Sequence, residues 1–316
     1  MHKVDSVRML DIESINNCNA DCPLCVRYPG MSTNDRLDWQ RAFSNCPDVF
    51  WQSLTKINLN GTTGDNIMHP EIKDMISWLC KNTTADLRLS TNGSIRSTEW
   101  WEDFADLPRP ITVIFGIDGL SGTHEIYRRR TNWQKIIDNA TSFIKSGGNA
   151  EWQFIVFDHN HTEIEECRKI ADRLGFSRFF TIYQDRFSEE EIEGIRRYSG
   201  DKNHIDVVRQ DQKNWSASKV NCRSKQIDWL SLYADATVWP CCWIMGWHRI
   251  DRKDLHIQLI KKHMKQILQI DLKEISLYNN TLSDILSSDL WQHRWLDSFE
   301  SNPNPICRKQ CSIYAT

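Results

Sequence analysis

The sequence predicts an α/β fold with a largely parallel sheet, and two observations support this class. Short β-rich runs recur through the first two-thirds of the chain, and helical stretches lie between them. Alternation of this kind favours parallel pairing, with each helix crossing over a face of the sheet. The strands are expected at residues 7–14, 54–60, 85–90, 111–118, 151–157 and 178–183.

The helical stretches are marked by apolar residues that return to one face of a helix. In residues 131–148 this face comprises Trp133, Ile136, Ile137, Ala140, Phe143 and Ile144, and Gly147 follows it. Cys80 and Cys167 lie on similar apolar stripes, so we interpret both cysteines as core residues. Six strand–helix units are too few for an eight-fold barrel, and an open doubly wound sheet is an alternative at this level.

The pattern changes after about residue 205. Residues 227–243 are predicted to form a short β-hairpin, and a polar, helix-rich stretch follows. No cysteine lies between residues 168 and 221, whereas later residues include Cys222, Cys241, Cys242, Cys307 and Cys311. We therefore predict two domains, residues 1–205 and residues 206–316.

Composition excludes several classes of protein. No apolar run approaches the roughly 18 residues that cross a bilayer, and the charged N-terminus lacks the apolar core of a signal peptide. We expect a cytoplasmic protein with no membrane partner, in which clustered cysteines bind metal or react. The formal charge of −3 gives no electrostatic reason to expect nucleic-acid binding.

Three cysteines lie close together directly after the first predicted strand. Cys18, Cys22 and Cys25 occur in the stretch CNADCPLC. Structural zinc normally takes four protein ligands, and a 4Fe–4S cluster is normally held by four thiolates. Three thiolates leave one iron open to a small molecule. The CxxxCxxC spacing after a first strand resembles the signature of the radical S-adenosylmethionine (radical SAM) enzymes.

This resemblance implies a fold and cofactors. In that family SAM binds the fourth iron through its amino and carboxylate groups. The reduced cluster cleaves SAM to methionine and a 5′-deoxyadenosyl radical, which abstracts hydrogen from a substrate C–H bond. The resemblance therefore implies a partial (β/α)6 TIM barrel over residues 1–205, with SAM and one 4Fe–4S cluster on Cys18, Cys22 and Cys25. It also implies an electron donor such as flavodoxin or ferredoxin.

Further segments, each after a predicted strand, resemble SAM-binding elements of the same family. The segment NGTTGDN resembles the family's Gly-Gly-Glu-Pro region, with Asp in place of Glu. The segment STNGS contains the family's TNG turn. The segment GIDG…HEIYRRR resembles the family's S-x-D-G…H-D-x-x-R pattern, with Gly116 in place of Ser. The resemblance implies an arginine near the SAM carboxylate, since a guanidinium pairs with a carboxylate through two hydrogen bonds. The residues at matching positions are Gly61, Gly64, Asp65, Thr91, Asn92, Asp118, Arg128, Arg130 and Asn160.

The placement of the late cysteines resembles that in the SPASM domain and in the shorter twitch extension of this family. One cysteine precedes the predicted hairpin, another follows its second strand, and a pair lies near the C-terminus. In the stretch ADATVWPC, Ala236 stands where Gly is typical. The resemblance implies a twitch extension with one auxiliary 4Fe–4S cluster, and a zinc site on the same thiols is the alternative. The implied ligands are Cys222, Cys241, Cys307 and Cys311.

Cys242 directly follows one implied ligand. It could donate hydrogen to a substrate radical, serve as an alternative ligand, or be a small buried residue. We expect a radical SAM oxidoreductase whose auxiliary cluster accepts an electron. An epimerase or peptide-modifying enzyme with Cys242 as hydrogen donor is the alternative, as is a non-catalytic Fe–S binding or redox-sensing protein.

The substrate is expected to be a small molecule rather than a ribosomal peptide. The chain begins almost at the first predicted strand, which leaves no room for an N-terminal leader-binding domain. A sugar, an aminoglycoside-like compound or a nucleotide-like compound would suit this expectation.

Overall fold

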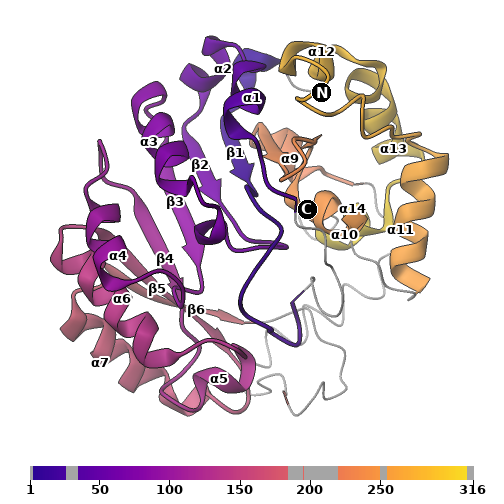
Figure 1. The fold of residues 1–316 in the computed structure, drawn as a ribbon. Helices are drawn as coiled ribbons and strands as arrows, with labels where there is room; N and C mark the ends of the chain where they lie inside the picture. Colours follow the sequence, from indigo (N-terminus) through magenta and orange to yellow (C-terminus); the bar gives the residue numbers. More distant parts are fainter. Residues whose placement is uncertain (1–2, 26–34, 184–194, 196–219, 250–254, 312–316) are drawn as a thin grey trace.

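The computed structural model describes residues 3–25, 35–183, 195, 220–249 and 255–311, and Figure 1 shows their fold. One eight-stranded sheet has the order β6-β5-β4-β3-β2-β1-β7-β8. All neighbouring strands are parallel except β7 and β8. The predicted α/β class is confirmed, with β1–β6 forming the partial barrel. The strands are β1 (Met9–Ile12), β2 (Lys56–Leu59), β3 (Asp86–Thr91), β4 (Thr112–Gly116), β5 (Asn149–Val156), β6 (Arg178–Tyr183), β7 (Trp229–Leu232) and β8 (Val238–Trp239).

Helices of the barrel region cover the outer face of the sheet, as α4, α6 and α7 do in Figure 1. The barrel-region helices are α1 (Trp39–Ser44), α2 (Asp48–Ser53), α3 (Ile72–Asn82), α4 (Thr98–Ala105), α5 (His124–Tyr127), α6 (Trp133–Lys145) and α7 (Ile164–Leu174), with short helices η1 (Val4–Ser6), η2 (Asn66–Met68) and η3 (His161–Glu163). The C-terminal helices are α9 (Arg223–Gln226), α10 (Cys242–Arg249), α11 (Leu255–Gln266), α12 (Leu282–Ser287), η4 (Leu290–Arg294), α13 (Trp295–Ser301) and α14 (Pro305–Cys311).

The outer face of the sheet is apolar because alternate strand residues pack against these helices. One row across the sheet consists of Leu10, Ile57 and Leu87, each at most 3% exposed. The predicted stripe of α3 is buried throughout, including Cys80, and Cys167 is buried in α7. Both cysteines are therefore core residues, as predicted. No helix among the described residues is long and apolar enough to cross a membrane.

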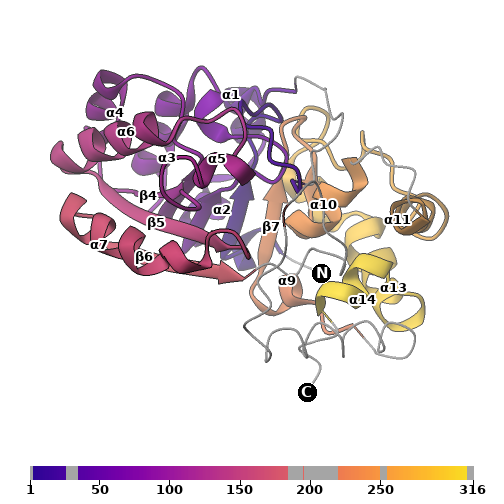
Figure 2. The same ribbon diagram turned by 90° about the horizontal axis from the view of Figure 1, so that it is seen from below.

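The predicted hairpin is formed by β7 and β8, and it continues the barrel sheet. β7 pairs in parallel with β1, so the C-terminal helices lie beside the open edge of the barrel (Figure 2). Ala236 in the turn has φ of 62°, a left-handed conformation that costs a non-glycine residue roughly 1–2 kcal/mol. The predicted domain boundary at 205/206 lies outside the described residues.

Candidate functional site

The carboxyl ends of the barrel strands surround a cavity of about 380 Å3. Active sites of parallel α/β barrels gather at this end of the sheet. Most of the residues predicted for the first site lie in the cavity wall, whereas Asp118, Arg130 and Asn160 do not line it. The predicted residues in the wall are Cys18, Cys22, Cys25, Gly61, Gly64, Asp65, Thr91, Asn92, Arg128 and Cys242.

The cysteine loop is attached to the loops that follow two other strands. Asn92 Nδ2 donates to Cys18 Sγ at 3.6 Å and to Asn19 Oδ1 at 2.9 Å. The Asp21 backbone N–H donates to the carbonyl of Arg129 at 2.9 Å. The loop that carries the three thiols is thus tied to the turn after β3 and to the segment after α5.

Close backbone approach explains the glycines of the second element. A Cβ on Gly61 would lie 2.0 Å from the carbonyl oxygen of Gly64, and one on Gly64 would lie 2.0 Å from that of Ile15. Backbone atoms at such distances cannot move aside cheaply. Glycine at both positions therefore lets this loop pass directly beside the chain that leads to the cysteines.

Asp65 is fully engaged by the protein. Its Oδ2 accepts from Thr91 Oγ1 at 3.0 Å and from the backbone and side-chain nitrogens of Asn92 at 2.8 and 2.7 Å. Its Oδ1 accepts from the backbone nitrogen of Ile67 at 3.2 Å. Burial raises the pKa of the carboxyl, and these bonds oppose that effect. Asp65 therefore holds the TNG turn in place, and Asn92 of that turn contacts Cys18.

Arg128 is held in the cavity wall by a buried ion pair. Its Nε lies 2.6 Å from Asp118 Oδ2, and the two side chains are 16% and 0% exposed. Burial is the largest single influence and lowers the pKa of Arg128, but the Asp118 carboxylate together with Cys22 and Tyr127 outweighs it, so that the pKa is raised. A Cβ on Gly116 would lie 2.8 Å from Arg128 Nη2. Glycine in place of the usual serine thus makes room for the guanidinium.

Arg130 and Asn160 lie outside the cavity wall. The Arg130 side chain is 75% exposed, and its Nε lies 3.7 Å from Asp21 Oδ2. Asn160 Nδ2 donates to the carbonyls of Asp118 and Ile155 at 3.0 and 2.9 Å, and thereby joins the ends of β4 and β5. Of the two arginines predicted for the SAM carboxylate, the fold brings Arg128 to the cavity.

Two buried acids on β1 and just beyond it were not predicted. Glu13 accepts from the backbone nitrogens of Thr62 and Thr63, both at 3.1 Å, and burial raises its pKa to about 7. Asp11 accepts from Asn58 Nδ2 at 2.9 Å, and burial raises its pKa to about 6. The available signal was an alternation of acidic and apolar residues in LDIES, which places both acids on the inner face of the sheet.

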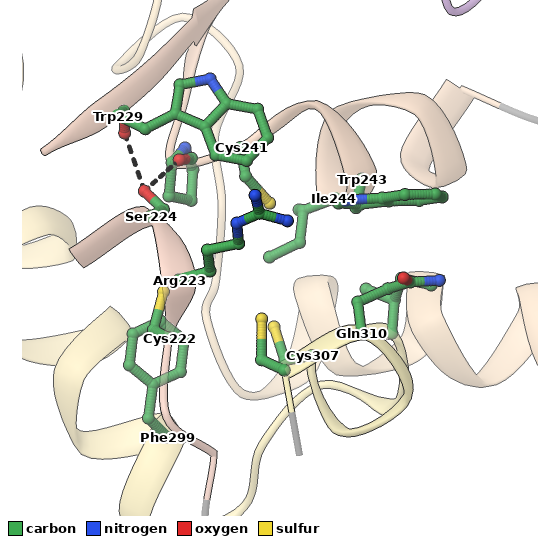
Figure 3. Close-up of a pocket in the computed structure, with 13 residues that line it drawn as sticks. Cys222, Arg223, Ser224, Trp229, Cys241, Trp243, Ile244, Phe299, Cys307 and Gln310 are labelled. Carbon is green, nitrogen blue, oxygen red and sulfur yellow. Dashed lines mark hydrogen bonds between the residues drawn. The ribbon is translucent and has the colours of Figure 1, made fainter. Parts of the chain in front are cut away.

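A second cavity, of about 230 Å3, is lined by Cys222, Cys241, Cys307 and Cys311 (Figure 3). The pKa of Cys307 is raised well above its usual value by burial and by the nearby thiol groups. Arg223 also lines this cavity, and its guanidinium points inward in Figure 3. Within the described part of the chain, no three Cys, His, Asp or Glu side chains converge closely enough to hold a single metal ion.

Adjacent cysteines face different cavities. Cys241 lines the second cavity, whereas Cys242 lines the first, together with the Cys18 loop. Cys242 also hydrogen-bonds to the carboxylate of Asp11. The fold thus separates two neighbouring thiols that the sequence presents as a pair.

Residues 12–174, just over half of the chain, match the Radical SAM superfamily. The chain belongs to the radical SAM superfamily. Membership implies a 4Fe–4S cluster and SAM. The residues present fit both groups, because three cavity thiols leave one iron open, closely packed glycines bring backbone to the cavity, and Arg128 supplies a cation.

Several solved structures share the fold of this chain. Streptococcus suis SuiB bound to S-adenosylmethionine has a TM-score of 0.62 at 13% identity, over 90% of this chain and 67% of SuiB. The structure of anSMEcpe with bound AdoMet and the Cp18Cys peptide has a TM-score of 0.57 at 13% identity, over 96% of this chain and 89% of that protein. At 13% identity these likenesses show a shared fold and nothing more. No curated protein sequence matches the chain.

Proposed function

We propose that this radical SAM protein is an epimerase that removes a hydrogen atom from a small polar molecule and returns one from Cys242. The observation that carries the proposal is that Cys242 lines the same cavity as Cys18, Cys22 and Cys25. A thiol in that cavity can meet the substrate radical where it forms. The oxidation expected from the sequence becomes the second candidate.

The first cavity supplies the groups that such a reaction needs. Cys18, Cys22 and Cys25 would hold the 4Fe–4S cluster, and Arg128 would bind the SAM carboxylate. When bound, the cluster and SAM supply the hydrogen-abstracting radical. Glu13 fixes the Thr62–Thr63 backbone, and Asp65 fixes the TNG turn, so both acids keep the wall in shape.

Epimerisation leaves the donor thiol one hydrogen atom short, so a second redox group is needed to restore it. Transfer of hydrogen from the Cys242 thiol completes the product and leaves a sulfur radical, which one electron and one proton restore to the thiol. We propose that Cys222, Cys241, Cys307 and Cys311 would hold a twitch-type auxiliary 4Fe–4S cluster, which would supply this electron from flavodoxin or ferredoxin. The four thiols surround a cavity rather than one point, which favours a cluster over the zinc alternative.

Two-electron oxidation of the substrate is the second candidate. Cys241 and Cys242 are neighbours in the chain, so an auxiliary cluster on Cys241 would lie next to the first cavity. It could then accept an electron from the substrate radical, while a proton leaves to solvent. The same geometry thus serves an oxidant or a thiol donor, and the fate of hydrogen separates them.

The first experiment tests for catalysis itself. Anaerobically reconstituted protein with dithionite and SAM should release 5′-deoxyadenosine, and Cys18→Ala/Cys22→Ala/Cys25→Ala should release none. Cys46→Ala is the control, because Cys46 is buried and lines neither cavity. Unchanged release in the triple variant would refute the radical SAM site, and absence of release from the wild type would favour a non-catalytic Fe–S protein.

The second experiment separates the two reactions, using a substrate found by fractionating a metabolite extract from the source cells. In deuterated water an epimerase should place solvent deuterium at the inverted carbon, because thiol protons exchange with water. Cys242→Ala should stop turnover after hydrogen abstraction. A product oxidised by two electrons, formed equally by wild type and Cys242→Ala, would establish oxidation instead.

We propose a small-molecule substrate and a cytoplasmic location. The structures of SuiB with the precursor peptide SuiA and of anSMEcpe with a peptide provide the competing idea of peptide modification. Fold likeness at 13% identity does not transfer a substrate. If only the peptide fraction of the extract increased hydrogen abstraction, peptide modification would replace the small-molecule proposal.

A further inference from the structure

The inner face of the sheet is polar, whereas barrel interiors are usually filled by branched apolar residues. The strand register aligns one polar row across β7, β1, β2, β3, β4 and β5. Asn60 and Ser90, the next inward-facing positions on β2 and β3, line the first cavity, as does Gln153, the second such position on β5. Buried polar groups cost stability unless they are hydrogen-bonded, and within this row Asn58 donates to Asp11 and Asn149 donates to Thr112. The aligned row consists of Ser231, Asp11, Asn58, Arg88, Thr112 and Asn149.

The charges on this face do not balance. Arg88 forms an ion pair with Glu151, and Arg128 forms one with Asp118. Among the described residues, no ion pair reaches Asp11. Its side chain is 2% exposed, and its pKa of about 6 leaves it mostly ionised at neutral pH. A buried carboxylate without a cation is unfavourable, and a bound cation would relieve it.

Asp11 lies directly behind the cavity wall. The side chains of Asn60 and Cys242, which both line the cavity, hydrogen-bond to its carboxylate. Ser231, its register neighbour on β7, is 0% exposed, and its hydroxyl has no hydrogen-bond partner among the described residues. Buried hydroxyls are normally paired. An ionised acid and an unpaired hydroxyl therefore lie together behind this part of the wall.

We infer that the inner face recognises the reacting substrate, and that this substrate is a small polyol carrying a protonated amine beside Asn60 and Cys242. The inference rests on the proposed function, because it assigns the substrate to the same cavity. The amides of Asn60 and Gln153 and the hydroxyl of Ser90 offer donors and acceptors that suit hydroxyl groups. The Asp11 carboxylate attracts the ammonium group through one layer of side chains.

The test compares two sugars that differ by one amine. Binding of D-glucosamine and D-glucose to the reconstituted full chain with SAM, without reductant, is measured by saturation-transfer NMR. D-glucosamine should bind at least about tenfold more tightly, and Asp11→Asn should reduce this preference to about twofold. Asparagine keeps the shape of the side chain and one oxygen that can accept from Asn58 Nδ2, so the variant should remain folded. Asp86→Asn is the control, because Asp86 is exposed at the start of β3.

A second variant tests the same idea by gain of charge. Ser90→Asp places a carboxylate in the cavity wall next to Asn60 rather than directly on Asp11, and it should increase the preference for D-glucosamine at least about threefold. Equal binding of both sugars, no binding of either at tens of millimolar, or an unchanged preference in Asp11→Asn would overturn the inference. So would an Asp11→Asn variant that loses SAM affinity but keeps the sugar preference, since the acid would then serve SAM. Turnover is not needed, so 5′-deoxyadenosine release judges the proposed function separately.

Discussion

Asp118→Asn should lower the free energy of unfolding by about 3–5 kcal/mol, the usual cost of removing one partner of a buried ion pair. Asp118 is fully buried and Arg128 is 16% exposed, so water cannot replace the lost carboxylate. Asp118 Oδ1 accepts from the Ile155 backbone nitrogen at 2.7 Å. If the asparagine oxygen keeps that bond, its amide nitrogen faces Arg128 Nε, and two donors oppose each other.

Urea unfolding followed by tryptophan fluorescence measures this loss. The midpoint of thermal unfolding should also fall by about 5–8 °C for a chain of this size. The affinity for SAM should fall about tenfold, because the guanidinium is no longer oriented towards the cavity. Asp103→Asn is the control: Asp103 Oδ2 lies 2.5 Å from Lys73 Nζ, but the side chains are 64% and 30% exposed, and its loss should cost under about 1 kcal/mol. Equal stability of the two variants would refute the role given to the buried pair.

Three further predictions concern other parts of the molecule. Anaerobic reconstitution should give about eight irons per wild-type chain. A variant with Ala at Cys222, Cys241, Cys307 and Cys311 should bind about four irons. About four irons plus zinc in the wild type would instead support the zinc alternative. Gly64→Ala should weaken SAM binding at least about tenfold, since its Cβ would meet the Ile15 carbonyl. Gly122→Ala is the control: its Cβ meets no atom within 4 Å, so it costs only the backbone strain of a φ of 87° and should leave SAM binding unchanged. Equal SAM affinities of the two variants would contradict the close-packing explanation. Burial raises the pKa of Asp11 from 3.8 to about 6, so the stability that its protonated form contributes is full below pH 3.8 and is lost as pH rises through 6. In urea unfolding, the free energy of unfolding of Asp11→Asn relative to the wild type should therefore grow by about 1 kcal/mol from pH 5 to pH 8. A difference that stays constant with pH would show that the pKa of Asp11 is not raised.

Local patterns in the sequence determined the secondary structure and predicted the residues of the first site. The apolar stripe of α3 and the alternation in the strands depend only on residue spacing, so they were readable before folding. The CxxxCxxC loop is equally local: three thiols within eight residues are close in any fold. The late cysteines were grouped by resemblance, and the fold does bring all four around one cavity.

Tertiary structure decided which of these residues meet, because side-chain direction depends on contacts far apart in the sequence. Arg128 and Arg130 are two residues apart, yet the buried carboxylate of Asp118 draws one inward while the other stays exposed. Cys241 and Cys242 are adjacent, but the start of α10 turns their side chains into different cavities. Asp11 became a site residue only when the pairing of β7 with β1 closed the inner face around it. Such pairings are set by long-range packing, which residue spacing alone does not specify.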